Sequence, residues 1–340
     1  MSTYQGLLLR CDFGDTGVIP AADYYWLSPD IIPYGQDFLD YGTAVETYGG
    51  PDIGKAVINN LNNFIYVRCK NIADTTIQGT VNLYYANASL FLLPSTWTRV
   101  SNPNPEEPFV FGDGSTYIPG QAIALAQSPF SLGGLPGDGH YCFIAVANNN
   151  NIPFGVPSTF DSNADFALWV RNNPNVAQRN VEHRLGSDST RVEYLTFGNS
   201  NPFPSNFLMV LQGAGLPPKV NWEAKCADTR LSKPFSDGGT FSTNEGAATT
   251  ITVPPLVGSG TPLMTMAFTF STHDGQPFPP TASITVNYFQ LPTSQEQSAT
   301  IAEKEKSVVR EYSVPAMEPG GPERVTSTLM KLGSAELLFE

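Results

Sequence analysis

The sequence predicts an all-β protein made of two antiparallel immunoglobulin-like β-sandwiches in series, with a short helical or extended C-terminal tail. Segments of about four to nine residues, rich in β-branched and aromatic residues, recur along the chain between Gly, Pro, Asn or Asp. Charged residues make up only 14% of the 340 residues, against roughly 25% in an average domain. Glycine (30 residues) and proline (29 residues) are abundant, which favours loop-rich β structure.

Changes in composition predict four parts of the chain. Residues 1–27 carry closely spaced turn signals, and we expect an extended segment packed on the domain that follows. Residues 28–185 contain the strands of the first sandwich, and "LGSDST" is a short linker. Residues 190–292 contain the second sandwich. The remaining 293–340 form the tail, because the composition changes abruptly at Pro292.

The predicted strands of the first sandwich alternate in polarity. In "FIYVRCKNI" we place Ile65, Val67 and Cys69 in the core, because Arg68 belongs on the outside. The other segments predicted as strands in this domain are "SPDIIPYG", "GTVNLYYA", "SLFLLP", "AIALA", "HYCFIAVA" and "DFALWVRN". We expect almost no helix before residue 293.

The second sandwich and the tail are predicted in the same way. The strand segments are "RVEYLTFGN", "FLMVLQGA", "VNWEAKC", "ATTITVPP", "LMTMAFTFST" and "ASITVNYFQLP", with turns such as "SDGGT" between them. In the tail, Thr293 and Glu296 form a capping box, so we expect a helix over 293–312. The prolines and glycines of "PAMEPGGPE" then prevent its continuation.

Five segments of the first domain resemble a known family. They are, in order, "SPDI", "NNFIYVRCKN", "GTVNLYYA", "GHYCFIAVA" and "NNPNVAQRNV". Together they resemble the consensus of CARDB-type bacterial immunoglobulin-like domains over residues 28–183. The resemblance implies an accessory module of the kind found in secreted and surface proteins. The second domain is only generically similar to immunoglobulin and fibronectin folds.

The resemblance also implies a role for two cysteines. It places Cys69 and Cys142 on facing sheets, near the position of the bridge in immunoglobulin domains, so we expect both in the core and close enough to pair. Two interpretations stay open. In a reducing compartment they are buried thiols that act as small apolar side chains. After export they form an inter-sheet disulfide.

Several function classes receive no support. The net charge of −13 argues against nucleic acid as a partner, because phosphate binding needs a basic surface. No stretch reaches the ~18 apolar residues of a membrane span, so we expect no membrane insertion. The four cysteines contain no CxxC pair and the three histidines no HExxH, so we expect no metal and no cofactor. Without GxSxG or kinase motifs, we also expect no catalytic residues and no enzymatic activity.

The function that these observations favour is that of a non-catalytic bacterial structural or interaction protein. Its sandwiches would mediate assembly or surface binding, through protein partners or self-assembly. One alternative is a carbohydrate-binding or toxin-like effector module that acts on a host surface, with a glycan as ligand. Another is a hydrolase without a recognisable motif. The apolar run Leu7–Leu9 is too short for a signal peptide, so we expect synthesis in the cytoplasm, with or without export by a specialised secretion system.

The tail ends in a segment that is unusually apolar for a free terminus. In a flexible tail these side chains would be exposed to water. We therefore expect the tail either to fold back on its own sandwich or to dock on a neighbouring subunit or secretion partner. The residues predicted to dock are Leu329, Met330, Leu332, Leu337, Leu338 and Phe339. On the docking interpretation, residues 324–340 serve assembly and are not needed for folding.

Overall fold

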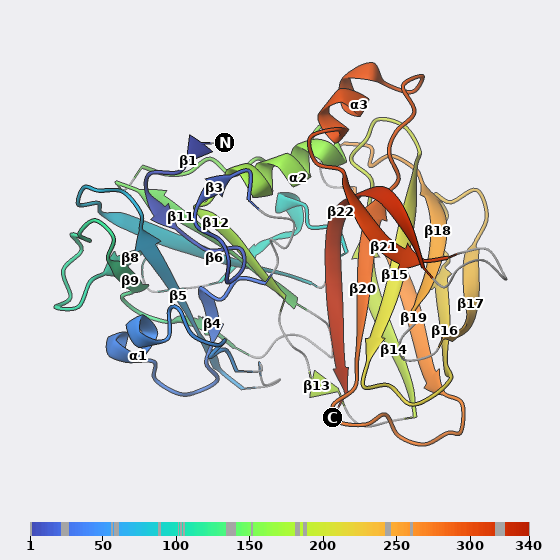
Figure 1. Ribbon diagram of the computed structural model, residues 1–340, viewed down its shortest axis with the longest axis horizontal. Coiled ribbons are helices and arrows are strands. Elements are labelled where there is room, and N and C mark those ends of the chain that lie inside the picture. Colours follow the sequence, from blue (N-terminus) through green and yellow to red (C-terminus); the bar gives the residue numbers. More distant parts are fainter. Residues whose placement is uncertain are drawn as a thin grey trace. The chain divides into compact units, whose positions relative to one another are not determined.

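The protein is all-β, as predicted. Antiparallel sheets dominate its computed structural model, and the helices among the described residues are short (Figure 1). The structure describes residues 2–21, 27–55, 57, 61–87, 90–100, 102, 104, 106–133, 141–150, 152–180, 184–185, 189–241, 246–258, 261–316 and 324–339.

The chain divides into two compact units. Unit 1 comprises residues 1–87, 96–157 and 168–183, and unit 2 comprises 88–95, 158–167 and 184–340. The last change of unit falls at Arg184, close to the predicted linker. However, the segments 88–95 and 158–167 belong to unit 2, so the prediction of one continuous domain over 28–185 is wrong for them. The tail is also part of unit 2 and does not stand apart from it.

Unit 1 is built on one ten-stranded antiparallel sheet with the order β10-β5-β9-β8-β6-β11-β12, to which β2, β4 and β7 are attached. The pairing is thus continuous, in place of the two separate sheets that we expected. A small sheet pairs β1 (Ser2–Thr3) with β3 (Val18–Ile19). The strands of the large sheet are β2 (Leu7–Leu8), β4 (Ile31–Pro33), β5 (Asn63–Asn71), β6 (Gly79–Asn87), β7 (Thr98–Arg99), β8 (Glu107–Val110), β9 (Ile123–Ala126), β10 (Phe130–Leu132), β11 (Tyr141–Asn149) and β12 (Val176–Asn180).

The core of unit 1 lies inside this curled sheet. Side chains from β5 and from β11 meet in one buried apolar cluster, although other strands separate the two along the sheet. Ile65, Val67 and Cys69 lie in the cluster, which confirms the prediction from their alternation. The residues of β11 in the same cluster are Tyr141, Phe143, Ala145 and Ala147.

The prediction that Arg68 points to solvent is wrong. Its side chain is fully buried on the other face of β5, where Nε donates to Asp30 Oδ1 at 2.9 Å. The same guanidinium donates to the backbone oxygens of Ala44 and Pro29. Arg10 donates to the same carboxylate, to Oδ1 at 2.7 Å and to Oδ2 at 3.0 Å. The chain before β5 covers this face, so a charge expected outside is paired inside.

Among the described residues, two short α-helices precede residue 293, where almost no helix was predicted. The helix α1 (Tyr41–Glu46) begins at Asp40, whose carboxylate accepts from Thr43 N at 3.0 Å. The segment "DFALWVRN", predicted as a strand, lies in α2 (Asn163–Asn172). Ser162 Oγ accepts from Asp165 N at 3.1 Å and donates to the Asp165 carboxylate at 2.9 Å. This Ser-x-x-Asp arrangement caps the helix, and it was the sequence signal for it.

Unit 2 contains two sheets. The six-stranded sheet has the order β13-β22-β20-β15-β18, with β21 paired to β22, and the four-stranded sheet has the order β14-β19-β16-β17. Burial alternates along β16 and β19 of the four-stranded sheet, whereas residues 207–211 of β15 and 286–290 of β20, in the six-stranded sheet, are buried on both faces. The strands are β13 (Arg184–Leu185), β14 (Thr190–Phe197), β15 (Ser205–Ala214), β16 (Val220–Cys226), β17 (Phe235–Phe241), β18 (Ala247–Val253), β19 (Met264–Thr272), β20 (Ser283–Gln290), β21 (Arg310–Pro315) and β22 (Arg324–Phe339).

Each of the two segments that unit 2 takes from the first half of the chain contributes buried residues to it, among them 90–93 and Phe166. The rings of Phe91 and Phe166, one from each segment, pack edge to face at a centroid distance of 5.3 Å. The Leu90 N–H donates to the Thr196 carbonyl at 2.7 Å. At Gly333 of β22, a Cβ atom would lie 2.2 Å from the Leu90 oxygen, so only glycine allows this approach.

The predicted tail completes the six-stranded sheet. The helix α3 (Ala299–Glu305) is shorter than the predicted 293–312 and begins at Ser298, whose side chain accepts from Ile301 N. The hairpin of β21 and β22 follows, and β22 lies between β13 and β20. In Figure 1 the long red strand β22 runs beside β20. Unit 2 therefore includes its C-terminal strand as a structural element.

Candidate functional site

Five of the six apolar tail residues that were predicted to dock on a partner are buried within the protein. Leu329, Met330, Leu332, Leu337 and Phe339 are each at most 1% exposed. The backbone of Leu338 pairs with Ser283 of β20, and its side chain lies outside the described residues. Because β22 is part of its own sheet, the prediction of a docking surface is wrong for the five described side chains.

The two cysteines predicted to pair face different sides of the sheet. Cys69 is buried in the apolar cluster of unit 1, as predicted. Cys142 is buried too, but Tyr141 and Phe143 on either side of it point into that cluster, so Cys142 points away from it. Its sulfur lies 3.1 Å from Asn180 Oδ1. Both cysteines are free thiols, and no disulfide joins them in this structure.

A buried polar cluster in unit 2 connects the tail with the segment 158–167. Asn163 Nδ2 donates to Gln290 Oε1 at 2.5 Å, and Gln290 Nε2 donates to Glu305. Thr293 donates to the same carboxylate, from its N–H at 2.7 Å and from its hydroxyl at 2.5 Å. These groups satisfy one another in the interior, so we interpret the cluster as structural. Burial raises the pKa of Glu305, although the hydrogen bonds from Thr293 and Gln290 oppose this effect.

The raised pKa of Glu305 predicts a pH-dependent stability for unit 2. The folded state holds this proton more tightly than the unfolded chain, so the contribution of Glu305 to stability is largest below the usual pKa of 4.5. This contribution is lost as the pH rises through the raised pKa. Thermal unfolding of Glu305→Gln should therefore show the variant gaining stability relative to the wild type as the pH rises above 4.5. Thr293→Val removes the hydroxyl whose hydrogen bond lowers the pKa of Glu305. This variant should therefore lose more stability than the wild type as the pH rises. A constant difference between Glu305→Gln and the wild type would contradict this account.

In the part of the chain that the structure describes, no three His, Cys, Asp or Glu side chains come together as a metal site would require. Among the same residues no helix is long and apolar enough to cross a membrane.

One candidate site is a pocket at the edge of unit 2, which we call the edge pocket. It has a volume of about 450 Å³ and lies where the last strand of each sheet, β17 and β18, comes to the surface. The hydroxyl of Thr249 on β18 donates to the Asp237 carboxylate on β17, which connects the two strand edges. The lining residues are Leu231, Ser232, Lys233, Pro234, Phe235, Ser236, Asp237, Thr250, Ile251 and Thr252.

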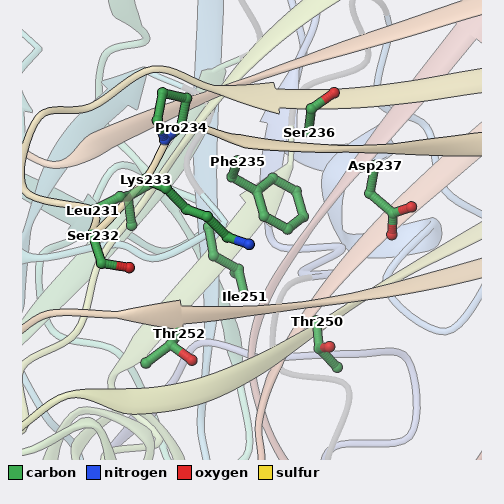
Figure 2. Close-up of a pocket in the computed structure, with 10 residues that line it drawn as sticks. All are labelled: Leu231, Ser232, Lys233, Pro234, Phe235, Ser236, Asp237, Thr250, Ile251 and Thr252. Atoms are coloured by element: carbon green, nitrogen blue, oxygen red, sulfur yellow. The ribbon is translucent and has the colours of Figure 1, made fainter.

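Figure 2 shows how the side chains of the edge pocket are arranged. The ammonium of Lys233 extends between the Phe235 ring and the side chain of Ile251, while Thr250 and Thr252 line the opposite strand. The pocket thus combines an apolar surface, a row of hydroxyls, one cation and one carboxylate, that of Asp237. The sequence did not predict it because "SDGGT", within β17, has the composition of a turn.

Lys233 differs from the paired lysines of unit 2. Lys225, Lys304 and Lys306 each form an ion pair with a carboxylate at 2.6 to 2.8 Å. Among the described residues, no carboxylate lies within that reach of Lys233. A lysine that has no carboxylate partner among the described residues favours an anionic group of a ligand at this position, although the net charge of −13 opposes it.

Comparison with models of known protein families finds no match for the chain, and comparison with curated protein sequences finds no significant relative.

Proposed function

We propose that the protein is a non-catalytic interaction protein that binds an extended, acidic segment of a partner protein along the β17 and β18 edges. The observation that carries the proposal is the meeting of two strand edges beside a pocket that holds Lys233, a lysine without a carboxylate partner in the part of the chain that the structure describes. The resemblance to CARDB-type modules agrees with a non-catalytic role.

The strand edges would provide the backbone part of the recognition. β17 pairs on one side with β16, and β18 pairs on one side with β15. The other side of each strand has no strand partner among the described residues, so an added strand could pair there with the N–H and C=O groups that are not already bonded, as Gly238 N is to Asp237. Pro234 lacks an N–H, which confines pairing on β17 to the residues after it.

The edge pocket would provide the side-chain part. An apolar side chain of the segment would pack on Phe235 and Ile251, and an acidic neighbour would pair with Lys233. Asp237 is already occupied, because it accepts from Thr249 and from Gly238 N at 2.8 Å. It therefore orders the two edges while it keeps its negative charge, and an acidic residue of the segment would pair with Lys233.

Selection of random peptides displayed on phage against the full-length protein tests this proposal. The enriched peptides should alternate β-branched and polar residues and carry at least one Asp or Glu. Binding of a synthetic enriched peptide, measured by fluorescence anisotropy, should weaken about tenfold in Lys233→Ala and fall with rising salt. N-methylation of alternate peptide nitrogens should remove binding, because it removes ladder donors.

Lys225→Ala is the matched control, since Lys225 is an exposed lysine on the neighbouring strand β16 and already pairs with Glu223. It should leave peptide binding unchanged. If both variants lost the same affinity for the peptide, the net charge of the protein and not the position of Lys233 would explain the loss. Peptide binding that survives both Lys233→Ala and N-methylation would refute the proposed site.

A further inference from the structure

We propose that unit 1 carries a separate binding site for a neutral saccharide. The site is a polar groove of about 390 Å³, which we call the amide groove. It is independent of the edge pocket and of the function proposed above. Its lining residues are Gln78, Gly79, Thr80, Asn104, Glu106, Pro108, Thr116 and Gln127.

A buried carboxylate holds both rims of the amide groove. Glu107 is 0% exposed, and its Oε2 accepts from Asn104 Nδ2 at 2.9 Å while its Oε1 accepts from Ser128 N at 2.6 Å. Ser128 follows Gln127 on the opposite rim, and Gln127 N donates to the Pro108 oxygen at 2.9 Å. No cation pairs with Glu107 in the described part of unit 1. Burying a carboxylate without a cation costs folding free energy. In return, the hydrogen bonds that Glu107 accepts hold the two rims in position.

The polar atoms left over in the groove are mostly acceptors. The amide nitrogen of Asn104 faces Glu107, because a carboxylate only accepts, so the Asn104 carbonyl oxygen is left for a ligand. Glu106 Oε2 accepts from the Thr80 hydroxyl at 3.0 Å, and the described residues provide no donor to Glu106 Oε1. The Thr80 hydroxyl in turn accepts from Asn148 Nδ2 at 3.0 Å, which fixes the direction of this chain of bonds.

This lining suits a ligand that presents several hydroxyl groups. Adjacent hydroxyls can donate to Glu106 and to Asn104, and the amide of Gln127 can both donate to and accept from a further hydroxyl. The volume is at the small end of ligand sites, which fits one or two sugar rings. The negative charge of Glu106 disfavours acidic sugars, so the expected ligand is uncharged.

Saturation-transfer-difference NMR on the full-length protein tests the site with the methyl glycosides of glucose, galactose, mannose and N-acetylglucosamine. At least one neutral hexoside should receive saturation. Its dissociation constant should rise about tenfold or more in Glu106→Gln, which removes a charge-assisted hydrogen bond. Glucuronic acid should bind more weakly than glucose.

Matched variants show whether the hexoside binds in the amide groove. Glu106 is not fully buried, so Glu106→Gln should fold normally, whereas Glu107→Gln should weaken binding by loosening the rims. Asp74→Asn, which changes an exposed carboxylate of the same unit, should bind the hexoside as the wild type does. The proposal fails if none of the four hexosides binds or if Glu106→Gln binds equally well. It also fails if binding requires Ca²⁺ and Ca²⁺ alone shifts the groove resonances, since the acceptors would then hold a cation.

Discussion

Deletion of residues 324–340 is expected to unfold unit 2. The deletion removes β22, which pairs with β20 along eight residue pairs and carries five side chains that are at most 1% exposed. It would leave β20 as an apolar edge, and the truncated protein should aggregate or lose the calorimetric transition of unit 2. This is the opposite of the expectation that the tail serves assembly only. A truncated chain that keeps its melting behaviour would show that β22 is dispensable.

Single substitutions within β22 should destabilise unit 2 to an extent that depends on how deeply the side chain is buried. Leu337 is 0% exposed and faces Ile284 in the register with β20, so Leu337→Ala should destabilise unit 2 by about 2–5 kcal/mol. Thr328→Ala changes an exposed residue of the same strand and should stay within about 0.5 kcal/mol of the wild type. Urea unfolding followed by the near-ultraviolet signal compares the two. Similar losses in both variants would mean that burial in β22 does not determine its contribution.

Asp30→Asn is expected to destabilise unit 1 by about 3–5 kcal/mol. The Asp30 carboxylate is fully buried and accepts from both Arg10 and Arg68, whose side chains are 5% and 0% exposed. Without its negative charge the two guanidiniums remain buried beside each other. In calorimetry, the transition of unit 1 should move down by about 10 °C or more, and the transition of unit 2 should not move.

Asp37→Asn is the matched control. Asp37 pairs with Lys55 at 2.6 Å, but both side chains are well exposed, at 68% and 44%. Such a surface pair contributes at most about 1 kcal/mol. If Asp30→Asn shifted unit 1 no more than Asp37→Asn does, the buried pair would not be what holds the N-terminal chain to β5.

The sequence predicted strands best where a run rich in β-branched and aromatic residues lies between turn residues. β5, β15, β19 and β20 fall where they were predicted for this reason, and β19 also alternates with a period of two because one of its faces lies in the core. The class of the protein followed from these strands together with the turn residues between them.

The failures fall where local patterns are ambiguous. The run "DFALWVRN" is too short for its periodicity to distinguish a helix from a strand. The cap formed by Ser162 and Asp165 stabilises the helix α2 in this segment. The two glycines of β17 have low strand propensity, but pairing with Val220–Cys226 makes the segment a strand. Because β17 forms one wall of the edge pocket, the sequence did not predict this pocket.

By itself, the sequence determined the all-β class and the repeated strands, since both depend on a pattern of neighbouring residues. Tertiary structure alone decided the rest. Arg68 lies inside because Asp30, 38 positions away, supplies its counter-charge. Cys142 lies away from Cys69 because the register of β11 with β6 turns it to the other face. The apolar C-terminus is core because β20 offers it an edge. Pairing over such distances depends on which segments meet in space, and no local pattern encodes that choice.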